Sequence, residues 1–149
     1  MAVVVLGIAL LSSGCIVSPS TSLTLRVAPA ALDNIRGIGK VQAEASDENE
    51  NENGRQIENL LVIDVEATSG REALGKAADL LGARKWRVVA ENRPTIVSME
   101  SANWQDTHLV LRPFHPAYFE DYPDILEALK EASVKEESLV YIEVFEGEI

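Results

Sequence analysis

The sequence predicts an α+β fold of the ferredoxin-like kind, with two helices covering one face of an antiparallel sheet. From Leu60 onward the elements follow the order strand, helix, strand, strand, helix, strand, and an interruption at Pro94 leaves room for one extra strand. The strand segments alternate apolar and polar side chains, whereas the helical segments repeat apolar side chains every three or four residues. We expect the strand Leu23 to Val27 to be added at an edge of this sheet.

The first part of the chain contains short elements and a polar segment. Residues 30–36 are long enough for one or two helical turns. Residues 47–54 (Asp-Glu-Asn-Glu-Asn-Glu-Asn-Gly) contain no apolar side chain, which predicts a solvated loop or insert. We therefore expect the edge strand and an acidic loop within residues 23–56, followed by the ferredoxin-like domain in residues 57–149.

The clearest strand–helix unit begins at residue 60. The run from Leu60 to Ala67 is typical of a strand with Leu61, Ile63 and Val65 on one face. The next helix begins with a predicted capping box, in which Ser69 and Glu72 satisfy free backbone amides. Its predicted end is Gly82, a residue type common just after helices.

The remaining elements follow from the same patterns. Extended segments are predicted at residues 86–91, 95–100, 107–112 and 139–145. A second helix is predicted to begin near Pro123, since proline is tolerated in the first turn.

The N-terminus carries a motif that predicts the location of the protein. Residues 2–11 are an unbroken apolar run, too short to span a membrane and typical of a signal peptide. The following Leu-Ser-Ser-Gly-Cys, ending at Cys15, resembles the lipobox of bacterial lipoproteins. The resemblance implies cleavage after residue 14, a lipid on the Cys15 sulfur, residues 15–22 as a tether and an extracytoplasmic location at the cell membrane.

Two features of this segment differ from the usual lipobox pattern. Ser12 stands where an aliphatic residue is usual, and no Lys or Arg precedes the apolar run. Either the true start lies upstream of Met1, or export relies on the apolar run alone. The alternative is an N-terminal buried strand or helix in which Cys15 is a core residue.

Composition excludes some classes of function. The chain has 149 residues and a net charge of −11, a balance that argues against nucleic acid as a partner. The same charge disfavours electrostatic binding to anionic lipid, so membrane attachment depends on the predicted acyl group. With one cysteine, the chain can form no internal disulfide.

His108 is the residue best placed for acid–base chemistry. In the ferredoxin-like order its strand would lie beside the strand from Leu60, so Asp64 or Glu66 could face His108 or Arg112. A carboxylate next to a histidine is the minimum for general acid–base catalysis. The alternative is an ordinary cross-strand charge pair on a solvated face. No nucleophile motif accompanies the histidine, so we expect no catalytic residues.

No metal or cofactor is expected. His108 and His115 fall on different elements, and Cys15 is assigned to lipid. Residues 47–54 are similar to a calcium loop in composition, but the required glycine and the bidentate glutamate never occur together at the right spacing.

The segment from Phe114 to Tyr122 is the candidate interaction surface. Aromatic side chains offer a large contact area at a low entropic cost. We expect Tyr118 and Tyr122 to face solvent while Phe114 and Phe119 anchor the segment. The alternative is that Phe114 and Phe119 seal the end of the core while the two tyrosines pack on the second helix.

Three functions remain open at this point. The first is a lipid-anchored domain that binds a protein or another envelope component. The second is a lipoprotein that binds a small molecule or an ion. The third is a hydrolase-type enzyme that uses His108 with Asp64.

Overall fold

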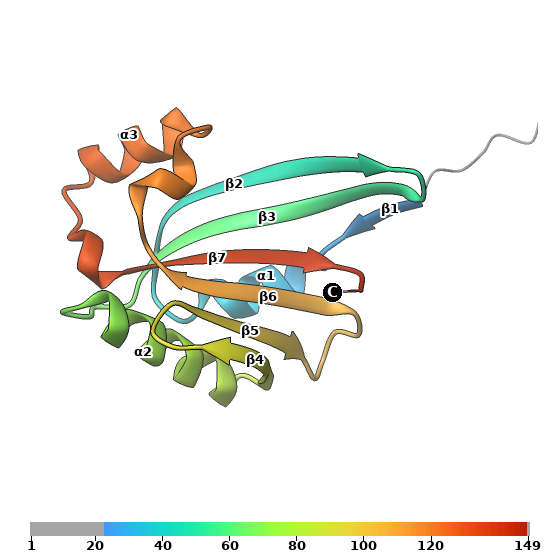
Figure 1. Ribbon diagram of the computed structural model, residues 1–149, viewed down its shortest axis with the longest axis horizontal. Helices are drawn as coiled ribbons and strands as arrows, with labels where there is room; N and C mark the ends of the chain where they lie inside the picture. The colour runs from blue at the N-terminus through green and yellow to red at the C-terminus, as the bar shows by residue number, and fades with distance from the viewer. Residues whose placement is uncertain (1–22, 149) are drawn as a thin grey trace, which may run out of the picture.

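The computed structural model describes residues 23–148, and the fold is α+β as predicted. The described chain contains three α-helices, two short 3₁₀ helices and seven strands that form one open sheet (Figure 1). The helices are α1 (Pro29–Arg36), α2 (Gly70–Ala83), η1 (Pro116–Phe119), α3 (Pro123–Glu131) and η2 (Glu136–Ser138). The strands are β1 (Leu23–Arg26), β2 (Lys40–Asn51), β3 (Gly54–Asp64), β4 (Trp86–Asn92), β5 (Ile96–Ser101), β6 (Thr107–Pro113) and β7 (Leu139–Glu146).

Strand β3 organises the sheet, because it pairs with three other strands. Antiparallel β2 runs along one side of β3, from the hairpin turn to Asp64. On the other side, the beginning of β3 pairs with parallel β1 and its later part pairs with antiparallel β7. The strands β7, β6, β5 and β4 then follow as an antiparallel meander.

The ferredoxin-like arrangement is not confirmed. Strand β7 lies between β3 and β6, so β3 and β6 are not neighbours as expected. The interruption at Pro94 is a tight turn between the antiparallel strands β4 and β5, which lengthens the meander by one strand. The predicted edge strand is present as β1, which pairs with β3 in parallel.

The helices also lie on both faces of the sheet rather than on one. Helices α1 and α2 cover the first face, where they pack on apolar side chains such as Leu61, Ile63 and Leu109. Helix α3 and η1 cover part of the second face, over a smaller core that includes Leu60 and Phe119. The end of β3 is therefore buried on both sides, which explains its nearly continuous apolar sequence.

Helix α2 begins as the sequence predicts. The Ser69 hydroxyl accepts a hydrogen bond of 3.1 Å from the Glu72 amide. The Glu72 carboxylate reaches back to the amide and hydroxyl of Thr68, one residue before the expected partner. The predicted end is wrong, since Gly82 lies inside the helix, which continues to Ala83 with Arg84 as the C-cap.

The acidic segment is a strand and not the predicted loop. Residues 47–51 are part of β2 and pair with β3 throughout. They need no apolar side chains, because this part of the hairpin is solvent-exposed and the backbone ladder supplies the hydrogen bonds. Arg55 on β3 also lies 2.9 Å from Glu50.

The expected division between residues 56 and 57 falls inside β3, so both parts belong to one sheet. The predicted signal peptide, Cys15 and the tether to residue 22 lie outside the described residues. Between residues 23 and 148, no helix is long and apolar enough to cross a membrane.

Candidate functional site

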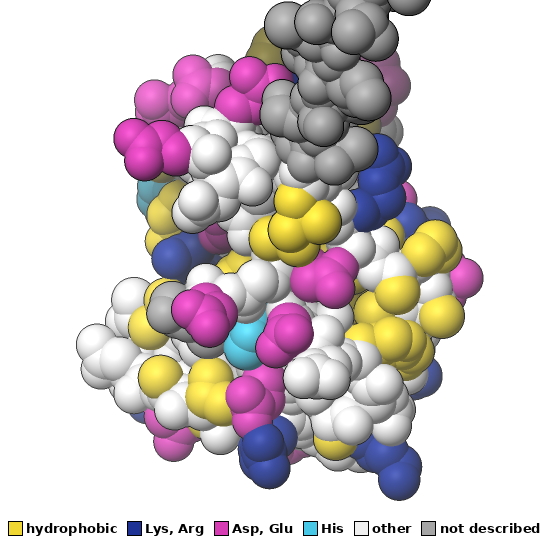
Figure 2. Space-filling model, turned by 90° about the vertical axis from the view of Figure 1, so that its right-hand side faces the viewer, with side chains coloured by type: hydrophobic (Ala, Val, Ile, Leu, Met, Phe, Trp, Pro, Cys, Tyr) yellow, Lys and Arg dark blue, Asp and Glu magenta, His cyan; other side chains and the backbone are white. Residues whose placement is uncertain are grey.

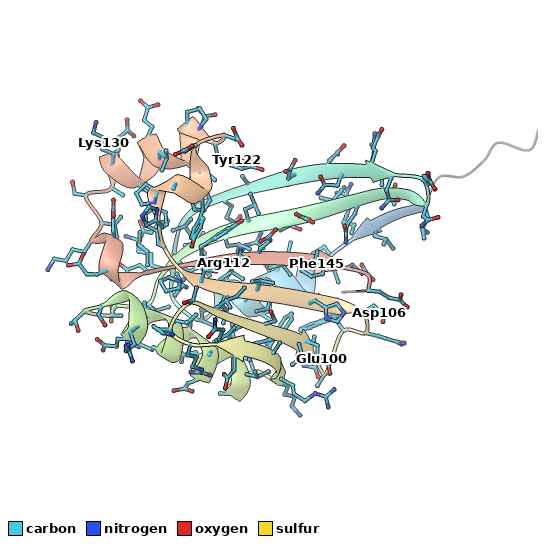
Figure 3. All side chains as sticks on the ribbon, in the orientation of Figure 1. Glu100, Asp106, Arg112, Tyr122, Lys130 and Phe145 are labelled. Carbon is cyan, nitrogen blue, oxygen red and sulfur yellow. The ribbon has the colours of Figure 1, made fainter. Side chains whose placement is uncertain are left out.

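The second face of the sheet is the most distinctive surface of the molecule. Its cover, helix α3 and η1, packs over side chains of β2, β3 and the start of β7. Side chains of β5 and β6 that point to this face, such as Ser98, Val110 and Arg112, are only partly buried. The candidate surface lies where the helical cover ends and the open part of the sheet begins (Figure 3).

The two phenylalanines of the aromatic segment anchor it, as expected. Phe119 is completely buried and packs edge-to-face on Tyr141, with 4.8 Å between ring centroids. Phe114 is half-buried and stacks on Phe119 at 5.6 Å. Because the Phe119 ring contacts both Tyr141 and Phe114, it holds η1 against the end of the sheet.

The two tyrosines of this segment differ from each other. Tyr118 is 44% exposed, as expected for a contact residue. Tyr122 is half-buried, and its hydroxyl donates a hydrogen bond of 2.9 Å to Asp47 on β2. Burial, followed by this hydrogen bond, raises the pKa of Tyr122 to about 12. The expectation of a solvent-facing residue therefore holds for Tyr118 and is wrong for Tyr122.

Tyr118 is joined to the open part of the sheet through Arg112. The guanidinium carbon of Arg112 lies 5.9 Å from the centre of the Tyr118 ring, within the range of a cation–π interaction. Arg112 also donates a hydrogen bond of 3.3 Å to Glu143 on β7. Both partners of this ion pair are about 70% buried, with side chains 30% and 27% exposed. The Tyr118 ring thus lies over the Arg112 guanidinium, and the ion pair with Glu143 fixes the position of that guanidinium.

Carboxylates from three strands meet beneath the same segment. Asp47 on β2 lies directly opposite Glu58 on β3. Glu58 lies close to Glu143 of β7, whose negative charge acts on the Glu58 carboxyl group. Burial raises the pKa of Glu58 above its usual range, and the negative charge of Glu143 raises it further. A polar network therefore runs from Tyr122 through these carboxylates to Arg112 and Tyr118.

No family model, curated protein or solved structure matches the chain. What the surface can do therefore follows from its own groups: an exposed aromatic ring, a half-buried ion pair and a carboxyl group with a raised pKa. These groups are suited to contact with a partner that has both apolar and hydrogen-bonding chemistry.

His108 does not form the predicted dyad. It lies opposite Phe145 on β7 and Glu100 on β5, and its ring stacks on Phe145 at 5.8 Å. Asp64 pairs with Leu139, six residues along β7 from Phe145, which corresponds to about 20 Å at the usual rise of a strand. The hydrolase hypothesis with His108 and Asp64 is therefore wrong in its geometry, because β7 separates the two residues.

His108 lies in acidic surroundings at the end of the molecule where β5 ends and β6 begins. Several acidic side chains gather at this end (Figure 2). Glu100, Asp106 and Phe145 mark the same region in Figure 3. The Nδ1 atom of His108 is buried and has no hydrogen-bond partner among the described residues.

The two histidines lie on different elements of the described structure. Residues 23–148 contain no group of three or more His, Cys, Asp and Glu that could hold a metal ion. His115 lies away from His108, at the start of η1, where its Nδ1 accepts a hydrogen bond from Ala117. In the acidic segment, the side-chain oxygen of Asn51 accepts a hydrogen bond from the backbone amide of Asn53 and so stabilises the hairpin turn.

Two members of the site were missed in the sequence. Glu58 and Asp47 face each other only because β2 pairs with β3. The composition of the acidic segment predicts a loop and therefore does not indicate this pairing. The dipeptide Asn53-Gly54 was the available signal, since Asn-Gly between two extended segments is typical of a β-hairpin. Glu143 is not predicted either, because its partners Arg112 and Glu58 come from distant parts of the chain.

Proposed function

We propose that this chain is a lipid-anchored extracytoplasmic protein whose folded domain binds a protein partner of the cell envelope. The surface is formed by Tyr118, Arg112 and Glu143, with Phe114 and Phe119 holding the segment from beneath. The anchor is the lipid on Cys15 that the lipobox-like sequence predicts. The ferredoxin-like arrangement plays no part in this proposal.

The observation that carries the proposal is the position of Tyr118. It is one of four large hydrophobic side chains that are exposed in the described structure, and it packs over the guanidinium of Arg112. Tyrosine and arginine are enriched among the residues that dominate protein–protein binding energy. A tyrosine that rests on fixed neighbours also loses little further side-chain freedom on binding.

A protein partner suits this surface better than a small molecule. The Arg112–Glu143 pair is half-buried before any partner binds, so a partner that covers it need not desolvate a fully hydrated charge pair. The surrounding side chains lie on a sheet face and on η1, which favours an extended contact over an enclosed pocket.

The proposal is tested by affinity capture from detergent-solubilised membranes of the source cells. The native chain should retain a distinct protein that Tyr118→Ala loses by at least about tenfold, equivalent to about 1.4 kcal/mol of binding free energy. Glu127→Ala, a change at an exposed position of α3, serves as the matched control and should retain the partner. Equal retention by both variants would contradict the proposed surface.

A further inference from the structure

The free edge of β4 is chemically unusual for an edge strand. This strand pairs with β5 alone in the described structure, and each residue from Arg87 to Asn92 is exposed. Val88 and Val89 are 40% and 43% exposed. Natural proteins usually protect a sheet edge against pairing, and exposed valines on such an edge favour addition of another strand.

The same edge is basic within an acidic protein. Arg84, Lys85, Arg87 and Arg93 lie within ten positions, accompanied by the single acidic residue Glu91. The chain as a whole has a net charge of −11. The Arg87 guanidinium contacts Glu100 and that of Arg93 lies 2.8 Å from Glu91, but the two arginine side chains remain 74% and 42% exposed. An acidic strand is therefore the partner that this edge would attract.

The opposite edge of the sheet has the complementary character. Strand β2 lies at that edge and pairs with β3 alone in the described structure (Figure 1). The residues from Asp47 to Asn51 are all exposed, and they include Glu48 and Glu50. Arg55 of β3 compensates only part of this charge.

We propose that the β4 edge of one copy binds the β2 edge of a second copy. A contact between two β4 edges would bring the basic residues together, and a contact between two β2 edges would bring the carboxylates together. The charges therefore favour the head-to-tail contact, in which the β4 edge of one copy pairs with the β2 edge of the next. Because each copy in a pair keeps one edge free, further copies can add and form short chains of molecules.

The bulges in the two strands limit the extent of this contact. The register of β4 shifts between Val88 and Ala90, so only a short part of its edge offers a regular ladder. Strand β2 has its shift between Val41 and Ala43 and is regular from there to Asn51. A short ladder with complementary charge gives a weak association that salt opposes and that confinement to a membrane surface promotes.

The test is disulfide cross-linking between two differently tagged full-length chains that are expressed together in their native membrane. One chain carries Ser46→Cys on β2, and the other carries Val89→Cys on β4. The contact predicts a 46–89 cross-link that is severalfold stronger than the 46–46 and 89–89 products. The unchanged chain, in which Cys15 is the only cysteine, sets the background. A dominant 89–89 product, or no product above background, would overturn the inference.

Charge reversal provides the second measurement. Arg87→Glu with Arg93→Glu in the Val89→Cys chain should reduce the cross-link severalfold, and Glu48→Arg with Glu50→Arg in the other chain should restore it. Rescue shows that the loss does not arise from unfolding, whereas failure of the rescue would contradict the charge pairing. Tyr118→Ala should leave the cross-link unchanged, so the failure of this inference is distinguishable from the failure of the proposed partner surface.

Discussion

The Tyr122 hydroxyl donates a hydrogen bond to Asp47 across 75 residues of sequence, with an O–O distance of 2.9 Å. This contact joins the aromatic segment to the acidic half of β2. It also fixes the start of α3, since Tyr122 is the N-cap residue of that helix. The aromatic segment is thus attached through Tyr122 at its end and through Tyr118 on Arg112 at its middle.

The variant Tyr122→Phe should lower the free energy of unfolding by about 1 kcal/mol, because it removes one hydrogen bond and keeps the ring. Tyr118→Phe is the matched control, since no hydrogen bond of its hydroxyl is seen in the described structure. Urea unfolding of both variants measures the difference. Equal stability of the two variants would show that the Tyr122–Asp47 bond contributes nothing.

The variant Glu58→Gln tests the raised pKa of Glu58, which lies near Glu143. The pKa of Glu58 is raised in the folded state, so the stability from its protonated form is complete below its usual pKa. That stability is lost as the pH rises through the raised value. Glu58→Gln should therefore be more stable than the native chain at pH 7, and the difference should shrink toward pH 4.

The comparison requires melting curves over this pH range, with Glu127→Gln at an exposed position of α3 as the control. A stabilisation that stays constant with pH would mean that the pKa of Glu58 is not raised in the folded state. Loss of stability at pH 7 would mean that the Glu58 carboxylate is favourable as a charge.

Replacement of Phe119 by alanine should cost about 3 to 5 kcal/mol, because its completely buried ring would leave a cavity between η1 and Tyr141. Tyr118→Ala should cost far less, since its ring is 44% exposed. Thermal or urea unfolding of both variants provides the measurement. Similar losses would indicate that Tyr118 is part of the core and not of a contact surface.

The lipid anchor is tested by Cys15→Ser, because only a thiol at that position can receive the diacylglycerol. Incorporation of labelled palmitate should be abolished in this variant, and the chain should not be cleaved after Gly14. Gel mobility and fluorography measure both effects. A variant that still partitions into the membrane at the mature size would refute the lipobox interpretation.

The sequence predicts the α+β class because the periodicity of β3, α2 and β7 is local information. The capping residue Ser69 and the apolar stripe on α2 are confirmed for the same reason. The strand order depends instead on which strands pair, and paired strands can lie far apart in the sequence. The sequence around Pro94 is compatible with more than one arrangement. The place of β7 between β3 and β6 was therefore missed.

The candidate site was predicted in part. The aromatic content of the segment from Phe114 to Tyr122 indicates it as a candidate, and the burial of Phe119 and the exposure of Tyr118 are as predicted. Its polar partners were missed, because a solvent-exposed strand such as the end of β2 has no apolar pattern. Where side chains remain solvated, backbone pairing determines the structure and composition says little.

The most direct test of the central claim is a photo-cross-linker in place of Tyr118, used in intact cells that express the full-length chain. The account predicts one discrete adduct with a protein of the cell envelope. The same cross-linker at Glu127 on α3 should give no such adduct, and Arg112→Ala should weaken the product at position 118. The absence of an adduct at position 118, or the same adduct at both positions, would contradict the account.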